Sequence, residues 1–137
     1  MIGKNNPLNV RYNPLNRWIG QSGQTSGFCN FSDILYCIRA VAYLIMISYR
    51  KQGLYSVSEV ISRYAPADEN NTSTYIKFVC LKTNFSPTSH IITVRQVAEL
   101  IFFMSRFEGN DLFSYGYDIY GIINCIKSFN LKFYEKS

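Results

Sequence analysis

The sequence predicts a mainly α-helical domain of about five helices with an irregular N-terminal loop region. Apolar residues make up 47% of the 137 residues, which is enough to supply one sizeable core. Apolar side chains recur at helical spacing in five segments, and no convincing run of alternating residues indicates a substantial sheet. Pro and Gly are scattered and no repeat is present, so residues 1–137 are expected to form a single domain.

The first part of the chain contains a loop region followed by the strongest helical pattern. Residues 1–31 are rich in Asn, Gly, Pro and Ser, so we expect an ordered loop region with a short hairpin. Ser32 is placed to cap a helix, and Gly53 is placed to end it. The apolar face of this helix carries Ile34, Ile38, Val41, Ile45 and Tyr49.

Two shorter helices are predicted next. Ser56 and Glu59 have the spacing of a capping box, and the helix that they open must stop near Ala65-Pro66. A third helix is expected from Thr72 to Lys82, with Asn84 near its C-cap. Its inward positions are Tyr75, Ile76, Val79 and Cys80.

The last two helices complete the predicted core. Thr93 and Gln96 form a second capping box, which opens a helix that runs through Phe107 and is ended by Gly109. A final helix is expected near residues 117–128. The predicted core includes Ile38, Val41, Ile45, Val60, Val79, Val97 and Ile101, with residues 1–31 forming one wall of a groove.

Charge and apolar patterning limit the partners and the location. A net charge of +5 suits an anionic partner, which leaves nucleic acid, a membrane surface and a cell wall open. The longest apolar run, Ala40–Ile47, is far shorter than the roughly 20 residues that cross a bilayer, so no membrane span is expected. The opening residues 1–7 contain no secretory signal, so the protein is expected to stay in the cytoplasm where it is made until it is released.

The cysteines and the single histidine exclude a structural metal site. Cys29, Cys37, Cys80 and Cys125 form no Cys-x-x-Cys pair, and one histidine is too few for a zinc cluster. We therefore expect the four cysteines to be reduced and to be dispensable for activity. We also expect the protein to bind no metal and no cofactor.

Several segments in the first 80 residues form a motif pattern. In chain order they are residues 5–13 (NNPLNVRYN), 18–20 (WIG), 27–31 (GFCNF), 38–40 (IRA) and 64–72 (YAPADENNT), followed by Tyr75-Ile76. In order and spacing these segments resemble a family of short phage virion proteins that act on the bacterial cell wall. The chain departs from the family pattern at Leu8 and Cys37, where Gly is usual, and at Ala67, where a second Pro is common. The order is also similar to the glucosaminidase branch of the lysozyme-like superfamily.

This resemblance implies a lysozyme-like domain that cleaves the glycan strands of peptidoglycan with a Glu as general acid. It implies bacterial peptidoglycan as the partner, with other virion proteins as further candidates, and a location in the virion or in the host cytoplasm before release to the cell wall. In the glucosaminidase branch the catalytic Glu closes a helix upstream of the Asn-rich opening. Here a Glu closes a helix near the other end, at Phe107-Glu108-Gly109, so we expect a circularly permuted order in which Glu108 meets the opening segment.

Two carboxylic acids are the candidate catalytic groups. Glycosidic cleavage needs an acid that still carries its proton near neutral pH, a state that apolar surroundings favour. Glu108 follows an apolar helix, and Glu69 lies in a Pro-bounded loop beside Asp68. If only one acid is essential, we expect a lytic transglycosylase, in which the sugar's own hydroxyl attacks. If both are essential, water attacks.

Five further residues are expected to bind substrate. Trp18 and the tyrosines can stack on sugar faces, and Tyr75 and Arg39 can orient a sugar or a carboxylate. The resemblance adds Asn9 and Arg11 from the opening motif.

Two alternatives stay open. Cys29 and His90 are the components of a cysteine peptidase of the cell-wall type. The second alternative is that the chain is a non-catalytic virion or interaction protein. Its basic residues are spread along the chain and no nucleic-acid motif is present, so nucleic acid is not the expected partner.

Overall fold

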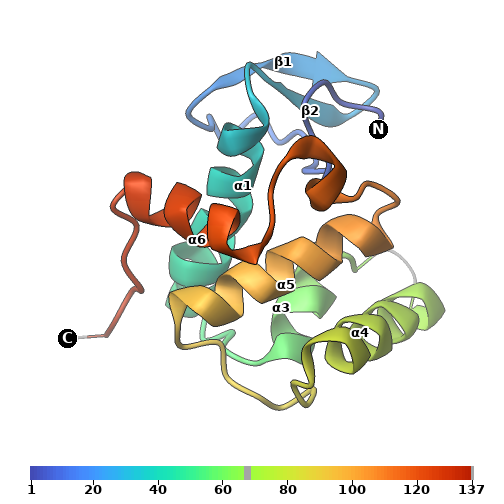
Figure 1. Ribbon diagram of the computed structural model, residues 1–137, viewed down its shortest axis with the longest axis vertical. Coiled ribbons are helices and arrows are strands. Elements are labelled where there is room, and N and C mark those ends of the chain that lie inside the picture. The colour runs from blue at the N-terminus through green and yellow to red at the C-terminus, as the bar shows by residue number, and fades with distance from the viewer. Residues whose placement is uncertain (67–68, 137) are drawn as a thin grey trace.

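The structure is a computed structural model that describes residues 1–66 and 69–136, and for Glu69 and Asn70 the backbone alone. The described residues form five main helices and a small two-stranded sheet, which confirms the predicted mainly α fold (Figure 1). In chain order the elements are β1 (Gln21–Thr25), β2 (Phe28–Phe31), α1 (Ile34–Tyr43), the π-helical turn η1 (Leu44–Ser48), α2 (Tyr49–Lys51), α3 (Val57–Tyr64), α4 (Glu69–Thr83), α5 (Val94–Phe107), the 3₁₀ turn η2 (Leu112–Tyr115) and α6 (Ile119–Ser128). Because α1, η1 and α2 follow one another directly, they make one long helix.

The expected hairpin is present at one end of the molecule (Figure 1). Strands β1 and β2 pair antiparallel, with Thr25 opposite Phe28. The two turn residues, Ser26 and Gly27, have φ angles of 51° and 85°. Positive φ at both central positions gives the turn the twist that a two-residue hairpin needs.

The first helix begins one residue later than predicted. Asp33, not Ser32, is its N-cap, and the Asp33 carboxylate accepts a hydrogen bond from the Leu35 N–H at 2.9 Å. The Ser32 N–H donates to the Gly20 carbonyl at 2.9 Å, which keeps Ser32 in the chain that leaves the hairpin.

Both predicted capping boxes are confirmed. Ser56 and Glu59 cap α3 reciprocally, and Thr93 and Gln96 cap α5 in the same way. The final helix, α6, begins at Ile119, after the N-cap Asp118 and two residues later than predicted.

Helix α4 begins at Glu69, three residues before the predicted start at Thr72. The Thr72 hydroxyl donates to the Ala65 carbonyl, so this side chain fastens α4 to the end of α3 instead of capping a helix. At the other end Asn84 has a φ of 63°, the left-handed conformation expected beyond a helix C-terminus.

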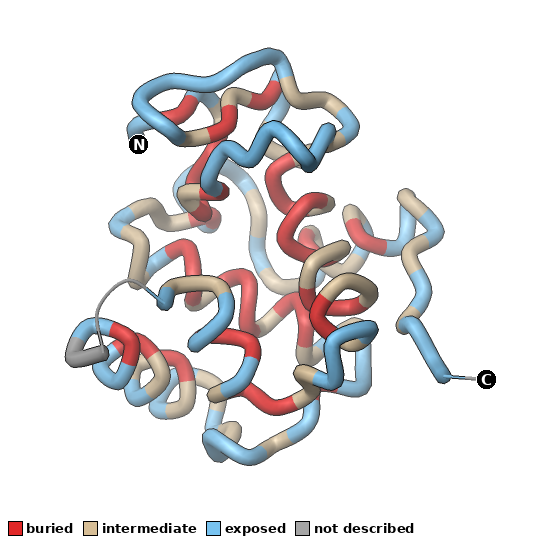
Figure 2. Tube along the Cα trace, turned by 180° about the vertical axis from the view of Figure 1, so that it is seen from behind, coloured by how far each residue is buried: buried red, intermediate tan, exposed pale blue. Residues whose placement is uncertain are grey.

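Helix α5 runs through the middle of the molecule and packs against α4, α6 and α1 (Figure 1). Figure 2 shows the buried residues along the inward sides of these helices and exposed residues on the outer faces. All seven predicted core residues are at most 1% exposed: Ile38, Val41, Ile45, Val60, Val79, Val97 and Ile101. In the described part of the chain, no helix has the length and apolar character that crossing a bilayer requires.

Candidate functional site

The opening segment is folded by a buried asparagine. Asn6 is fully buried, and its Nδ2 donates to the carbonyls of Val10 and Cys29, both at 2.9 Å. Its Oδ1 accepts the Val10 N–H at 2.8 Å. These bonds close residues 6–10 into a turn against β2, and within that turn Asn9 has a φ of 53°. The turn therefore sets the direction of the Asn9 side chain.

The end of α5 meets this turn. Glu108 is the C-cap of α5, and its N–H donates to the Met104 carbonyl at 3.0 Å. Gly109, with a φ of 87°, ends the helix and directs the chain away. The Asn110 Nδ2 then donates to the Pro7 carbonyl at 3.2 Å. The loop after α5 is thus fastened to the opening segment.

Glu108 and Asn9 are in direct contact. The Asn9 Nδ2 donates to the Glu108 Oε1 at 3.0 Å, across a sequence separation of 99 residues. The same Nδ2 lies 3.4 Å from the Glu108 carbonyl oxygen. The predicted meeting of the Glu-ended helix with the opening segment is therefore present.

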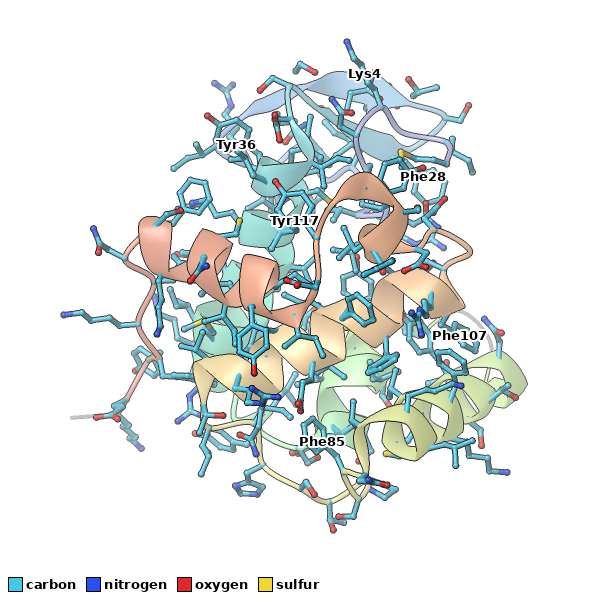
Figure 3. All side chains as sticks on the ribbon, viewed as in Figure 1. Lys4, Phe28, Tyr36, Phe85, Phe107 and Tyr117 are labelled. Carbon is cyan, nitrogen blue, oxygen red and sulfur yellow. The ribbon has the colours of Figure 1, made fainter. Side chains whose placement is uncertain are left out.

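These residues line a hollow of about 270 Å³, which we call the carboxylate pocket. Its lining residues are Asn9, Arg11, Phe28, Tyr64, Ala65, Asn71, Tyr75, Phe107 and Glu108. Residues 1–31 form one side, as predicted, and the ends of α3 and α5 with part of α4 form the other. Figure 3 labels a residue from each side, Phe28 on β2 and Phe107 at the end of α5.

Two tyrosines, Tyr75 and Tyr64, line the carboxylate pocket and connect it to the core. Tyr75 is 1% exposed and stacks on Phe107 with ring centroids 4.0 Å apart. Burial raises the pKa of Tyr75 well above its usual value, and the nearby charge of Glu108 raises it further. The Tyr75 hydroxyl also lies 3.4 Å from the Met104 carbonyl oxygen. Tyr75 is therefore a neutral phenol buried beside Glu108, a position that suits support of the carboxyl group better than stacking on a sugar.

The second tyrosine, Tyr64, ties α3 to the opening turn. Its hydroxyl donates to the Leu8 carbonyl at 2.7 Å, and burial raises its pKa well above the usual value. Sequence reasoning did not select Tyr64, Phe28 or Phe107 as site residues. Tyr64 opens the Tyr-Ala motif of the resemblance, which was the one signal that pointed to it.

The other predicted substrate-binding residues lie in neighbouring hollows. A second hollow, of about 470 Å³, shares Asn9, Arg11 and Tyr64 with the carboxylate pocket and contains Trp18. A third, of about 340 Å³, contains Trp18 and Arg39. Asn9, Arg11, Tyr75 and Glu108 thus share one pocket, Trp18 adjoins it, and Arg39 lies one hollow further.

Four residues singled out in the sequence do not contribute a described side chain to the carboxylate pocket. The side chain of Glu69 and the whole of Ala67 lie outside the described residues. Leu8 and Cys37, where the chain departs from the family pattern, are both fully buried, so these departures fill the core instead of lining the pocket.

The cysteines offer no ligand cluster. All four are free thiols, and the described residues contain no group of three or more His, Cys, Asp or Glu side chains that could hold a metal ion.

Comparison with known proteins finds sequence similarity to a phage protein. It is 35% identical over 86 residues to Protein P5 of Pseudoalteromonas phage PM2, a match that covers 60% of this chain and 54% of that protein. The chain therefore spans about half the length of the curated relative that it matches. No protein-family model matches the chain.

Proposed function

We propose that this protein cleaves the glycan strands of peptidoglycan with Glu108 as the general acid. The observation that carries the proposal is the placement of Glu108. Its half-buried carboxyl group ends a helix, lines a pocket and receives a hydrogen bond from Asn9 on Oε1. That bond engages Oε1, so we assign the proton that a leaving sugar oxygen requires to Oε2.

The chemistry follows from a single proton donor. Glu108 gives its proton to the glycosidic oxygen, the bond from the anomeric carbon to that oxygen breaks, and positive charge develops on the sugar ring. The Glu108 carboxylate then accepts a proton from the attacking group. If water attacks, the product has a free reducing end. If the sugar's own hydroxyl attacks, the product is an anhydro sugar.

Two observations weigh against a cysteine peptidase. Cys29 is 1% exposed, and burial raises its pKa, whereas a nucleophilic thiol needs a lowered pKa. His90 stacks on Tyr55 with ring centroids 5.7 Å apart, and the Cys29 Sγ donates to the Arg11 carbonyl at 3.6 Å. The non-catalytic virion protein remains the principal alternative.

Glu108→Gln provides the direct test. We expect the release of fragments from purified sacculi to fall by about a hundredfold or more, because Gln cannot donate the proton. The melting temperature should stay almost unchanged, because the Gln oxygen can still accept the Asn9 N–H. Glu99→Gln is the matched control: it lies on the same helix but pairs with Arg95 at 3.2 Å outside the pocket. Full activity of Glu108→Gln would refute the proposal.

Glu69→Gln tests the number of essential acids. A loss as large as that of Glu108→Gln means that two acids act and water is the nucleophile. A small loss, together with an anhydro product in the mass spectrum, identifies the transglycosylase route.

A further inference from the structure

The second and third hollows form a groove that leads away from the carboxylate pocket. The second adjoins the pocket through Asn9, Arg11 and Tyr64, and the third adjoins the second at Trp18. We call these two hollows together the basic groove. Its arginines are Arg11 and Arg63 in the second hollow and Arg17 and Arg39 in the third.

The basic groove carries positive charge that none of its described lining residues neutralises. Among the residues whose side chains the structure describes, no Asp or Glu lines either hollow. In the part of the chain that the structure describes, the salt bridges join Arg95 to Glu99 and Arg106 to Asp111, and none of these four residues lines the groove. The groove therefore favours an anionic ligand, and Coulomb attraction increases as water is excluded.

Two of the guanidinium groups are held in place on aromatic rings. The Arg39 guanidinium carbon lies 5.6 Å from the ring centroids of both Tyr43 and Phe129, and that of Arg11 lies 5.3 Å from the Phe28 ring. The Arg39 Nε is buried and has no hydrogen-bond partner among the described residues. Guanidinium groups fixed in this way can form paired hydrogen bonds to a carboxylate with little loss of conformational freedom.

We propose that the basic groove binds the carboxylates on the side groups of the glycan strand, while Trp18 packs against a sugar face. This inference rests on the proposed function and specifies its substrate as a peptide-bearing glycan. A neutral glycan offers the same sugar faces but no partner for the arginines. A strand with stem peptides presents carboxylates at intervals along the groove, beginning beside Glu108.

Binding to defined glycans tests the proposal without turnover. The protein is used as the Glu108→Gln variant, and the fluorescence of Trp18, the single tryptophan, reports occupancy of the groove. Isothermal titration calorimetry runs on the same samples, so that binding without a fluorescence change is also detected. The probes are soluble strands with stem peptides, the same strands after amidase removal of the peptides, and N-acetylglucosamine oligomers of equal length.

We expect the peptide-bearing strand to bind at least about tenfold more tightly than the neutral oligomer. Added salt should weaken the first interaction and leave the second almost unchanged. The amidase-treated strand, which keeps only the lactyl carboxylate on every second sugar, distinguishes the two sources of charge: affinity near that of the neutral oligomer assigns the arginines to the peptides. Equal binding of all three probes would overturn the proposal.

Arginine variants identify the groove itself. Arg17→Gln combined with Arg63→Gln should weaken binding of the peptide-bearing strand about tenfold and leave the neutral oligomer unaffected. Arg95→Gln, an exposed arginine outside the groove, is the matched control and should change neither. A loss shared equally by both probes, or by the control, contradicts the proposal. If the ranking of ligands holds but the wild-type protein cleaves none of them, the binding proposal survives and the proposed enzymatic function fails.

Discussion

Asn9 combines a left-handed backbone conformation with an amide that contacts the proposed acid. Its φ of 53° is one that Asn adopts more readily than most residues, and its Nδ2 donates to Glu108 at 3.0 Å. The Asn9 Oδ1 is buried and has no hydrogen-bond partner within the described residues. The side chain is thus directed by the turn that Asn6 closes, and it positions Glu108 instead of filling the core.

Asn9→Gly separates these two properties. Glycine accepts the positive φ without strain, so the fold and melting temperature should change little, while the hydrogen bond to Glu108 is lost. We expect glycan cleavage to fall roughly tenfold or more because the acid is no longer held in one orientation. Kinetics on purified sacculi, with circular dichroism on the same sample, measures both effects.

The chain supplies a matched control for this variant. Asn5 has the same φ of 53°, but its Nδ2 donates to the Phe31 carbonyl at 3.0 Å, away from the carboxylate pocket. Asn5→Gly should lower stability slightly and leave the rate within a few-fold of normal. An equal loss of rate in both variants would mean that Asn9 has only a structural role.

At the scale of elements, the two capping boxes differ in charge and so should differ in their response to pH. Hydrogen bonds from the Ser56 backbone and side chain, and from the Tyr55 N–H, lower the pKa of Glu59. A carboxyl group with a lowered folded-state pKa stabilises the protein above its unfolded pKa of about 4.3, and this contribution is lost as the pH falls through the folded value. The Thr93 and Gln96 box carries no titrating group.

Glu59→Gln should therefore lose stability relative to the wild type at pH 7, and the difference should shrink as the pH falls below the unfolded pKa of about 4.3. Urea denaturation across this pH range measures it. Gln96→Ala is the control, and its loss of stability should stay constant over the same range. A pH-independent difference for Glu59→Gln would show that its charge adds nothing to the cap.

Ser56→Ala tests the other half of the same capping box. It should lower the free energy of unfolding by about 1 kcal/mol at pH 7, because a backbone N–H of α3 loses its cap.

Elements with local start and stop signals were predictable from sequence, and the others were not. The capping boxes of α3 and α5 act within four residues, and Gly53, Asn84 and Gly109 all adopt the positive φ that their positions after helices require. The start of α4 was misplaced because Thr72 serves a tertiary contact with Ala65. The turns η1 and η2 were missed because a brief change of helical pitch leaves no distinct apolar period.

At the scale of the whole molecule, ionisation of Tyr49, Tyr64 and Tyr75 opposes folding. Tyr49 and Tyr75 are buried, and Tyr64 is half-buried. Burial raises the pKa of Tyr49 to about 12 and those of Tyr64 and Tyr75 well above their usual values. The neutral phenols are favoured in the folded state, so their contribution is complete below the unfolded pKa of about 10 and is lost as the pH rises through the folded values. We expect the free energy of unfolding to decline from about pH 10 upward.

Ultraviolet titration of the 11 tyrosines tests this expectation. Tyr49, Tyr64 and Tyr75 should ionise only together with the loss of helical circular dichroism. Tyr49→Phe should move this alkaline transition to higher pH. Tyr120→Phe, at a ring that is 66% exposed, should leave it in place. Smooth ionisation of all tyrosines before unfolding would contradict the burial argument.

The carboxylate pocket could be predicted only in part. The contact between Glu108 and the opening segment was predicted from the resemblance and the hypothesis of a permuted order, since no local pattern links residues 99 positions apart. Tyr64 and Phe28 could not be predicted as site residues. They lie at the ends of α3 and β2, and the apolar periodicity of an element does not indicate which cavity its end residues line. Trp18 and Arg39 were expected to bind substrate, and α1 and the loop before β1 place them along the basic groove, outside the carboxylate pocket.

The separation between Asn9 and Glu108 has a consequence while the protein is being made. Ribosomes add about 5 to 20 residues per second, so the 99 residues between the two partners take roughly 5 to 20 s to synthesise. During that interval the opening segment exists without the carboxyl group that completes its pocket. A nascent chain that has not reached Glu108 lacks the proposed acid, so the proposed lytic activity cannot begin before residue 108 has been translated.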